Sequence, residues 1–115
     1  MQLEELLRRL ALNDERAVGT ATGAAPQGAG APVLDPKTRS LVRLGALLSV
    51  GAPTASCRVV VDGARVAGAS DEEIVAVLMA VGPAVGGARV VEAAPRLALA
   101  IDYDIEEADV AWEGP

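Results

Sequence analysis

The only cysteine of the chain, Cys57, is the side chain with the most distinctive chemistry. We expect it in the first turn of a helix that begins at Pro53 or Thr54, next to Arg58. The partial positive charge of a helix N-terminus and a neighbouring arginine both lower the pKa of a thiol, which would make Cys57 a peroxidatic nucleophile. A single cysteine among alanines and valines is more often a small buried hydrophobic residue. We favour the buried cysteine and keep single-cysteine peroxidase chemistry as an alternative.

Charged residues of the predicted helices form a second group of candidates. Arginines could bind the carboxylate of a small organic acid in a pocket between subunits, while a partly buried carboxyl group donates a proton. The catalytic candidates are Cys57, Asp62 and Glu73, and the ligand-binding candidates are Arg43, Arg65 and Arg89, with Glu92 as a further member of such a pocket. This hypothesis of a histidine-independent enzyme requires at least two of the charged side chains to converge on one apolar cavity.

The composition of the chain excludes several kinds of chemistry. There is no histidine, which removes the commonest general base, the commonest metal ligand and every Ser-His or Cys-His pair. One cysteine forms neither an intrachain disulfide, nor a Cys-x-x-Cys redox pair, nor a thiolate zinc site. The acids between Asp102 and Glu113 approach the spacing of a calcium loop, but Glu107 stands where that loop requires glycine. We therefore predict no metal and no cofactor.

Charge and hydropathy limit the partners that we expect. The net charge of −6 argues against a nucleic-acid partner and against anionic membrane surfaces. The N-terminal segment lacks the apolar centre of a signal peptide, and the uncharged run from Ile74 to Ala88 is shorter than the ~20 residues that cross a bilayer. We expect a cytoplasmic protein whose partners are other copies of itself and a small-molecule ligand.

The first third of the chain contains one clear helix signal. Between Gln2 and Leu12, leucines at positions 3, 6, 7 and 10 follow the i, i+3, i+4, i+7 spacing of an amphipathic helix. Residues 17–33 are uncharged and rich in glycine, alanine and proline, which predicts a flexible linker. The predicted organisation is an N-terminal helix over 1–16, this linker over 17–33, a helical domain over 34–102 and an acidic tail over 103–115.

The helical domain opens with strong start and stop signals. Asp35 is a good N-cap residue and Pro36 suits the first helical position, so we predict a helix from Pro36 to about Val50. Gly51 is a suitable residue to end it. The next predicted helix ends at Gly68.

The second half of the domain is the most hydrophobic stretch of the chain. Ser70 and Glu73 form a capping box at the start of a helix that we predict from Asp71 to about Val81. Its uncharged sequence predicts burial on most sides. We expect a break at Gly82-Pro83, a last helix that begins near Ala84 or Gly87, and a kink or division of that helix at Pro95.

Three segments resemble the carboxymuconolactone decarboxylase family, which includes the alkylhydroperoxidase D-like proteins. They are L-D-P-K-T-R-S-L-V-R-L-G-A-L from Leu34, A-R-V-A-G-A-S-D-E-E-I-V-A-V-L from Ala64, and G-P-A-V-G-G-A-R-V-V-E-A-A from Gly82. The resemblance covers roughly residues 34–102. It implies an all-α, alkylhydroperoxidase D-like helical bundle that assembles into homo-oligomers, trimers or hexamers, through helix faces.

The same resemblance bears on activity. Redox members of the family use a Cys-x-x-Cys motif with a histidine four residues on and a glutamate in the preceding helix, and the lactone decarboxylase also relies on a histidine. In one alignment register, the two cysteine positions and the histidine position are occupied by Pro53, Ser56 and Val60. In a register shifted by one residue, they are occupied by Ala52, Ala55 and Val59. The acid that often follows T-R in the family is replaced by Ser40. We therefore predict a divergent member without thiol peroxidase activity, acting as an oligomeric binding or structural protein.

Overall fold

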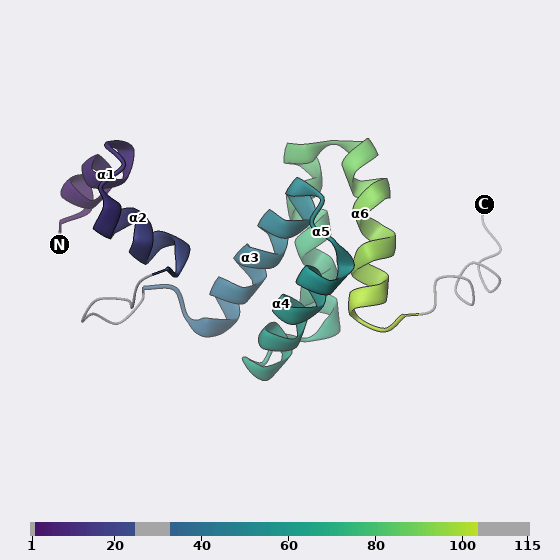
Figure 1. The fold of residues 1–115 in the computed structure, drawn as a ribbon. Coiled ribbons are helices and arrows are strands. Elements are labelled where there is room, and N and C mark those ends of the chain that lie inside the picture. The colour runs from purple at the N-terminus through teal and green to yellow at the C-terminus, as the bar shows by residue number, and fades with distance from the viewer. Residues whose placement is uncertain (1, 25–32, 104–115) are drawn as a thin grey trace. The chain divides into compact units, whose positions relative to one another are not determined.

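A computed structural model of the chain describes residues 2–24 and 33–103, and every regular element in these ranges is an α-helix (Figure 1). The helices are α1 (Leu3–Ala11), α2 (Glu15–Thr22), α3 (Pro36–Val50), α4 (Thr54–Val66), α5 (Asp71–Val85) and α6 (Gly87–Ala100). The all-α prediction is therefore confirmed over the described residues. None of these helices is long and apolar enough to span a bilayer. The chain divides into two compact units, residues 1–33 and 34–115.

The first unit contains α1 and α2. The predicted flexible linker is wrong for residues 17–22, because Asp14 caps a second helix by accepting a hydrogen bond from the amide of Ala17 at 3.0 Å. That cap and the alanines of α2 outweigh the cost of Gly19 inside the helix. Gly23 then ends α2 in the left-handed conformation. Residues 25–32 of the predicted linker lie outside the described residues.

The second unit is a bundle of α3 to α6 in which consecutive helices run in roughly opposite directions (Figure 1). The closest neighbours of α3 are α4 and α5, and the same two helices flank α6. The core between them consists almost entirely of small aliphatic side chains. Its fully buried members include Leu44, Leu48, Val61 and Ile74. Because such side chains are short, the four helices approach one another closely.

Local signals place both ends of α3 and the start of α5 as predicted. Asp35 accepts from the Thr38 amide at 2.7 Å, and Gly51 ends α3 with a φ of 73°. The capping box also forms, since the Ser70 hydroxyl accepts from the Glu73 amide at 3.1 Å while the Glu73 carboxylate accepts from the Ser70 amide at 3.0 Å. These contacts satisfy amides that a helix start otherwise leaves unpaired.

The predicted break at Gly82-Pro83 is wrong, because α5 continues to Val85 and the chain turns at Gly86 with a φ of 88°. Packing explains the continuity: a Cβ on Gly82 would lie 3.3 Å from Val90 of α6, so the glycine serves close helix contact and not a turn. Pro95 likewise lies inside an uninterrupted α6. It is on the exposed side, where solvent can bond to the carbonyl that a proline leaves free.

The expectation that α5 is buried on most sides is also wrong within one chain. Ile74 and Leu78 face the core, but the opposite side of the helix is open. Six exposed apolar residues lie there at helical spacing, namely Val75, Ala76, Met79, Ala80, Pro83 and Ala84. We call this surface the α5 stripe.

Candidate functional site

Cys57 lies one turn into α4 and is fully buried, with 0 % of its surface exposed. Its sulfur belongs to the aliphatic core and lies 4.0 Å from the carbonyl oxygen of Ala52. Burial raises the pKa of the Cys57 thiol above its ordinary value, and the positive charge of Arg96 opposes this effect only in part. The prediction of a buried cysteine is confirmed. A thiol in this environment is a poor nucleophile at neutral pH, because the thiolate is the reactive form.

Arg58, which the sequence suggested as the activator of that thiol, is engaged elsewhere. Its Nη2 donates to the carbonyl of Leu99 at 2.7 Å and lies 3.8 Å from a carboxylate oxygen of Asp102. The last carbonyls of α6 carry the negative end of the helix dipole, so a guanidinium beside them is stabilising. The side chain therefore fixes the end of α6, and Arg96 is the arginine that acts on Cys57.

A second arginine of α4, Arg65, holds the same end of the bundle. Its Nε and Nη2 both donate to one carboxylate oxygen of Asp71, at 3.1 and 3.0 Å, and Nη2 also donates to the carbonyl of Ile101 at 3.2 Å. This one side chain thus joins α4 to the start of α5 and to the end of α6. These contacts use the Nε and Nη2 donors of Arg65.

A cluster of charges from α6 lies against the end of α3. Within this cluster, Glu92 accepts from Arg89 at 3.0 Å and forms an ion pair with Arg96, also at 3.0 Å, while Arg96 donates to the carbonyl of Gly51 at 2.8 Å. The spacing of three and four residues along α6 brings the three side chains together. We call Arg89, Glu92 and Arg96 the α6 charge cluster. Its arginines are neutralised by one carboxylate and by the C-terminal end of α3, as expected of a structural cap.

Glu73 combines the capping box with a tertiary ion pair. Besides the Ser70 amide, its carboxylate accepts from the ammonium of Lys37 in α3 at 3.0 Å. The hydrogen bond from the Ser70 backbone, followed by that from Lys37, lowers the pKa of Glu73. A general acid at neutral pH needs the opposite shift, since it must hold a proton.

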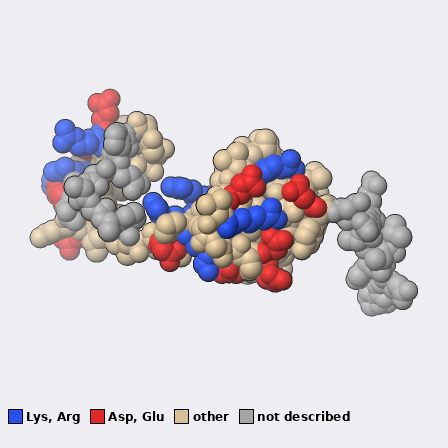
Figure 2. Space-filling model, turned by 90° about the horizontal axis from the view of Figure 1, so that it is seen from below, with Lys and Arg blue, Asp and Glu red and all other residues tan. Residues whose placement is uncertain are grey.

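The remaining two candidates, Arg43 and Asp62, are exposed on α3 and α4. Neither takes part in an ion pair within the described ranges. Of the charged candidates, only Arg89 and Glu92 contact each other directly. Charged side chains of both signs are interspersed on the face of the second unit that Figure 2 shows, so this face has no single-sign patch.

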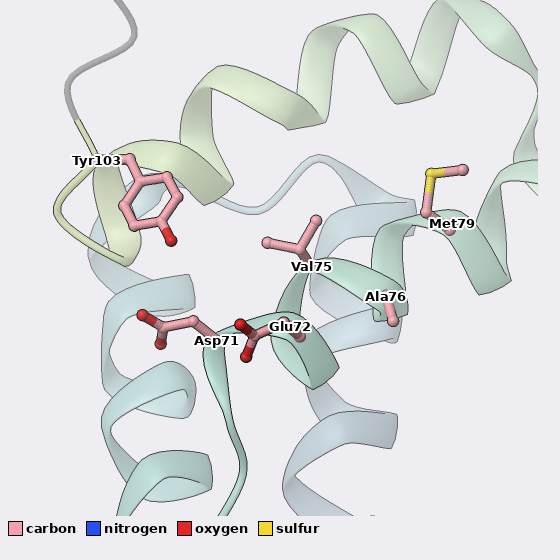
Figure 3. A pocket seen from close by; sticks show the side chains of 6 residues that line it. All are labelled: Asp71, Glu72, Val75, Ala76, Met79 and Tyr103. Carbon is pink, nitrogen blue, oxygen red and sulfur yellow. The ribbon is translucent and has the colours of Figure 1, made fainter. Parts of the chain in front are cut away.

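A hollow lies between α5 and Tyr103, which is three residues beyond the end of α6 (Figure 3). Its lining consists of Asp71, Glu72, Val75, Ala76, Met79 and Tyr103, and its volume is about 400 Å³. The floor is apolar, and the two carboxylates lie at one end. None of the charged candidates and no part of Cys57 lines this hollow.

The end of α6 positions Tyr103 at the hollow. Asp102 adopts a left-handed backbone conformation with a φ of 64°, and the amide of Tyr103 then donates to the carbonyl of Ala98 at 2.8 Å. This turn carries the tyrosine ring toward the first turn of α5 (Figure 3). The sequence analysis missed the hollow, although the spacing of Val75, Ala76 and Met79 relative to the buried Ile74 and Leu78 could have indicated a second apolar face on α5.

No group of three or more potential metal ligands occurs among residues 2–24 and 33–103. The acidic segment with calcium-like spacing runs from Asp102 to Glu113. Only its first two residues, Asp102 and Tyr103, are among the described residues.

Comparison with protein-family models matches residues 16–99 to the carboxymuconolactone decarboxylase family. The match covers well over half of the chain, and the helical bundle is consistent with it. The protein therefore belongs to the carboxymuconolactone decarboxylase family. A search of curated proteins found no match.

Proposed function

We propose that this protein is a homo-oligomeric member of the carboxymuconolactone decarboxylase family that has a binding or structural role and no thiol peroxidase activity. The observation that carries the proposal is the state of Cys57, which is the only cysteine, is fully buried, and has a raised pKa in a chain without histidine. Reduction of a hydroperoxide by a dithiol needs an exposed thiolate, a resolving thiol and a proton relay. The chain offers one buried thiol, no second cysteine and no histidine.

The residues at the positions of the family's redox cysteines and histidine support the same proposal. In either register they carry alanine, proline, serine or valine, at the junction before α4 and in its first two turns. A disulfide between Cys57 residues of two copies would need the sulfurs to meet, with Cα atoms within about 7 Å. Full burial of Cys57 inside its own bundle opposes such a contact.

The geometry of one subunit favours neither enzymatic alternative. Arg65, Glu73 and Arg89 are held by contacts within the bundle, and the described hollow is lined by other residues. The exposed apolar surface supports assembly: Val50, Val59, Val66, Met79 and Val91 each have more than 70 % of their surface exposed, and they are spread over all four helices of the domain. Where exposed apolar residues adjoin one another, as on the α5 stripe, they are typical of an interaction site.

Turnover of a small organic hydroperoxide tests the proposal directly. The protein is incubated with cumene hydroperoxide and dithiothreitol, and peroxide consumption is compared with that of the Cys57→Ala variant. We expect both rates to equal the uncatalysed rate. Turnover that disappears in the variant would establish single-cysteine peroxidase activity and overturn the proposal. Sedimentation velocity of the wild-type chain tests the oligomer, which a single monomeric species at all concentrations would exclude.

A further inference from the structure

Among residues 2–24 and 33–103, two helix faces expose apolar side chains to solvent. One is the α5 stripe, in which Met79 has 72 % of its surface exposed. The other is the leucine face of α1: this helix has no buried residue, and Leu3 and Leu7 have 78 % and 66 % of their surface exposed. Exposed apolar faces of this kind are stabilised when they are buried against each other.

The two faces are long enough to overlap. The ends of the leucine face, Leu3 and Leu10, are seven residues apart, and the ends of the α5 stripe, Val75 and Ala84, are nine residues apart. At a rise of 1.5 Å per residue they are about 10 Å and about 13 Å long. The leucines at positions 3, 6, 7 and 10 provide the i, i+3, i+4, i+7 anchors that an amphipathic helix uses in an apolar groove.

Charge determines the direction of such docking. The acids of α1, Glu4 and Glu5, are in its first turn, and Arg8 and Arg9 are in its last turn. The hollow is acidic at the end formed by Asp71 and Glu72. An antiparallel arrangement brings the arginine end of α1 to these carboxylates, whereas a parallel arrangement would place acid against acid. Asp71 is paired with Arg65, whereas Glu72 has no ion-pair partner within residues 2–24 and 33–103. Arg8 and Arg9 both pair with Glu5 inside α1, so in the docked state Glu72 would join Glu5 as a partner of Arg9.

The short helix α1 needs a surface on which to fold, and the α5 stripe offers one. With nine residues, α1 is shorter than the ~12–15 residues that a helix needs to be stable in water, so it requires a preformed surface. The α5 stripe is such a surface, because Ile74 and Leu78 anchor it in the core. Pairing of α5 with α5 would leave the leucines of α1 in water.

We propose that α1 of one copy docks antiparallel into the hollow on α5 of a second copy, with its leucines on Val75, Ala76 and Met79 and Arg9 beside Glu72. This inference rests on the proposed homo-oligomer and names the surface that forms it. Because the contact joins two different surfaces, it passes from copy to copy and closes into a ring when the rotation allows. A trimer is one such ring.

Matched charged substitutions test the contact by sedimentation velocity, with circular dichroism to verify helix content. Leu7→Glu in α1 and Met79→Glu in α5 are each expected to weaken self-association by roughly tenfold or more, since each places a charge in the apolar contact. Val66→Glu on α4 is the control, because Val66 is 90 % exposed and lies outside the hollow. Association as strong as that of the wild type in both test variants would overturn the inference.

A charge exchange tests the direction. Arg9→Glu and Glu72→Arg should each weaken the oligomer, and the double variant should recover most of the lost affinity. Additive losses in the double variant would count against the antiparallel arrangement.

Cysteine cross-linking identifies the occupant of the hollow. In a Cys57→Ala background, a Leu7→Cys chain is mixed with a tagged Met79→Cys chain and oxidised. A disulfide between the two chains supports the inference. A second sample is one chain that carries both substitutions. Disulfides only between Met79→Cys copies would overturn the inference in favour of pairing between α5 helices. Disulfides only within one doubly substituted chain would overturn it in favour of docking by the chain's own α1. If the wild-type chain is a monomer, both the proposed oligomer and this contact are refuted. If the chain is an oligomer and these variants do not weaken it, only the contact between α1 and α5 is refuted.

Discussion

Replacement of Gly51 by alanine should weaken the fold through two separable effects. Gly51 has a φ of +73°, a conformation that costs a residue with a Cβ about 1–2 kcal/mol. The added Cβ would also lie 2.6 Å from Nη1 of Arg89, too close for the α6 charge cluster to keep its geometry. Displacing Arg89 breaks its half-exposed ion pair with Glu92, worth about 0.2–1 kcal/mol. The expected total is about 1.2–3 kcal/mol.

Gly68→Ala provides the matched control. Gly68 has a φ of +99°, and an added Cβ there meets nothing within 4 Å, so this variant carries the backbone cost alone. We expect Gly51→Ala to exceed it by about 0.2–1 kcal/mol in the free energy of unfolding. The measurement is urea denaturation at one fixed protein concentration, because self-association adds to the apparent stability.

An Arg89→Ala background completes the experiment. Without the guanidinium, the alanine at position 51 has no atom at 2.6 Å to displace, so the excess over Gly68→Ala should disappear. Equal costs for Gly51→Ala and Gly68→Ala in the wild-type background would refute the reasoning. An excess that persists without Arg89 would also refute it.

Three further predictions concern the core and the cap. Alkylation of Cys57 by iodoacetamide at pH 7 should be slow in the native protein and fast in guanidinium chloride, since the thiol is buried and its pKa is raised; equal rates would contradict the buried site. The lowered pKa of Glu73 means that its contribution to stability is present above its ordinary value of 4.5 and is lost as the pH falls through the folded value. Glu73→Gln should therefore flatten the loss of stability in acid, and an unchanged pH profile would argue against the cap and the Lys37 pair. Leu44→Ala, at a position with 0 % exposure, should cost about 2–5 kcal/mol on denaturation, whereas Val42→Ala, at 58 % exposure, should cost less than about 0.5 kcal/mol; similar costs would contradict the placement of the core.

Sequence reasoning was most accurate where a few neighbouring residues decide the structure. The Asp35 cap and the Ser70–Glu73 capping box were predictable because each donor and acceptor lies within three residues of its partner. The break predicted at Gly82-Pro83 and the division of α6, one of the two outcomes predicted at Pro95, do not occur. Both prolines predict a break locally, but the packing of α5 against α6 and the solvent beside Pro95 make a continuous helix acceptable.

For the candidate site too, the sequence predicted what depends on neighbouring residues and did not predict contacts between distant ones. The burial of Cys57 followed from its alanine and valine neighbours. The roles of the arginines did not follow, because Arg58 bonds to a carbonyl 41 residues away and Arg96 to one 45 residues away. Contacts at such separations depend on how the helices are arranged, which periodicity does not specify. The open side of α5 was missed for a related reason: a helix without charges predicts burial, but not whether its own chain or another copy provides the cover.

Tyr103 can serve as an intrinsic fluorescence probe of the hollow. The chain has one tyrosine, one tryptophan and no phenylalanine, and the tyrosine ring lines the hollow on α5 with 55 % of its surface exposed. In a variant with Trp112 replaced by leucine, tyrosine emission would come from this residue alone. Its quenching by iodide would then fall when a helix covers the ring, so occupancy of the surface could be titrated without a label.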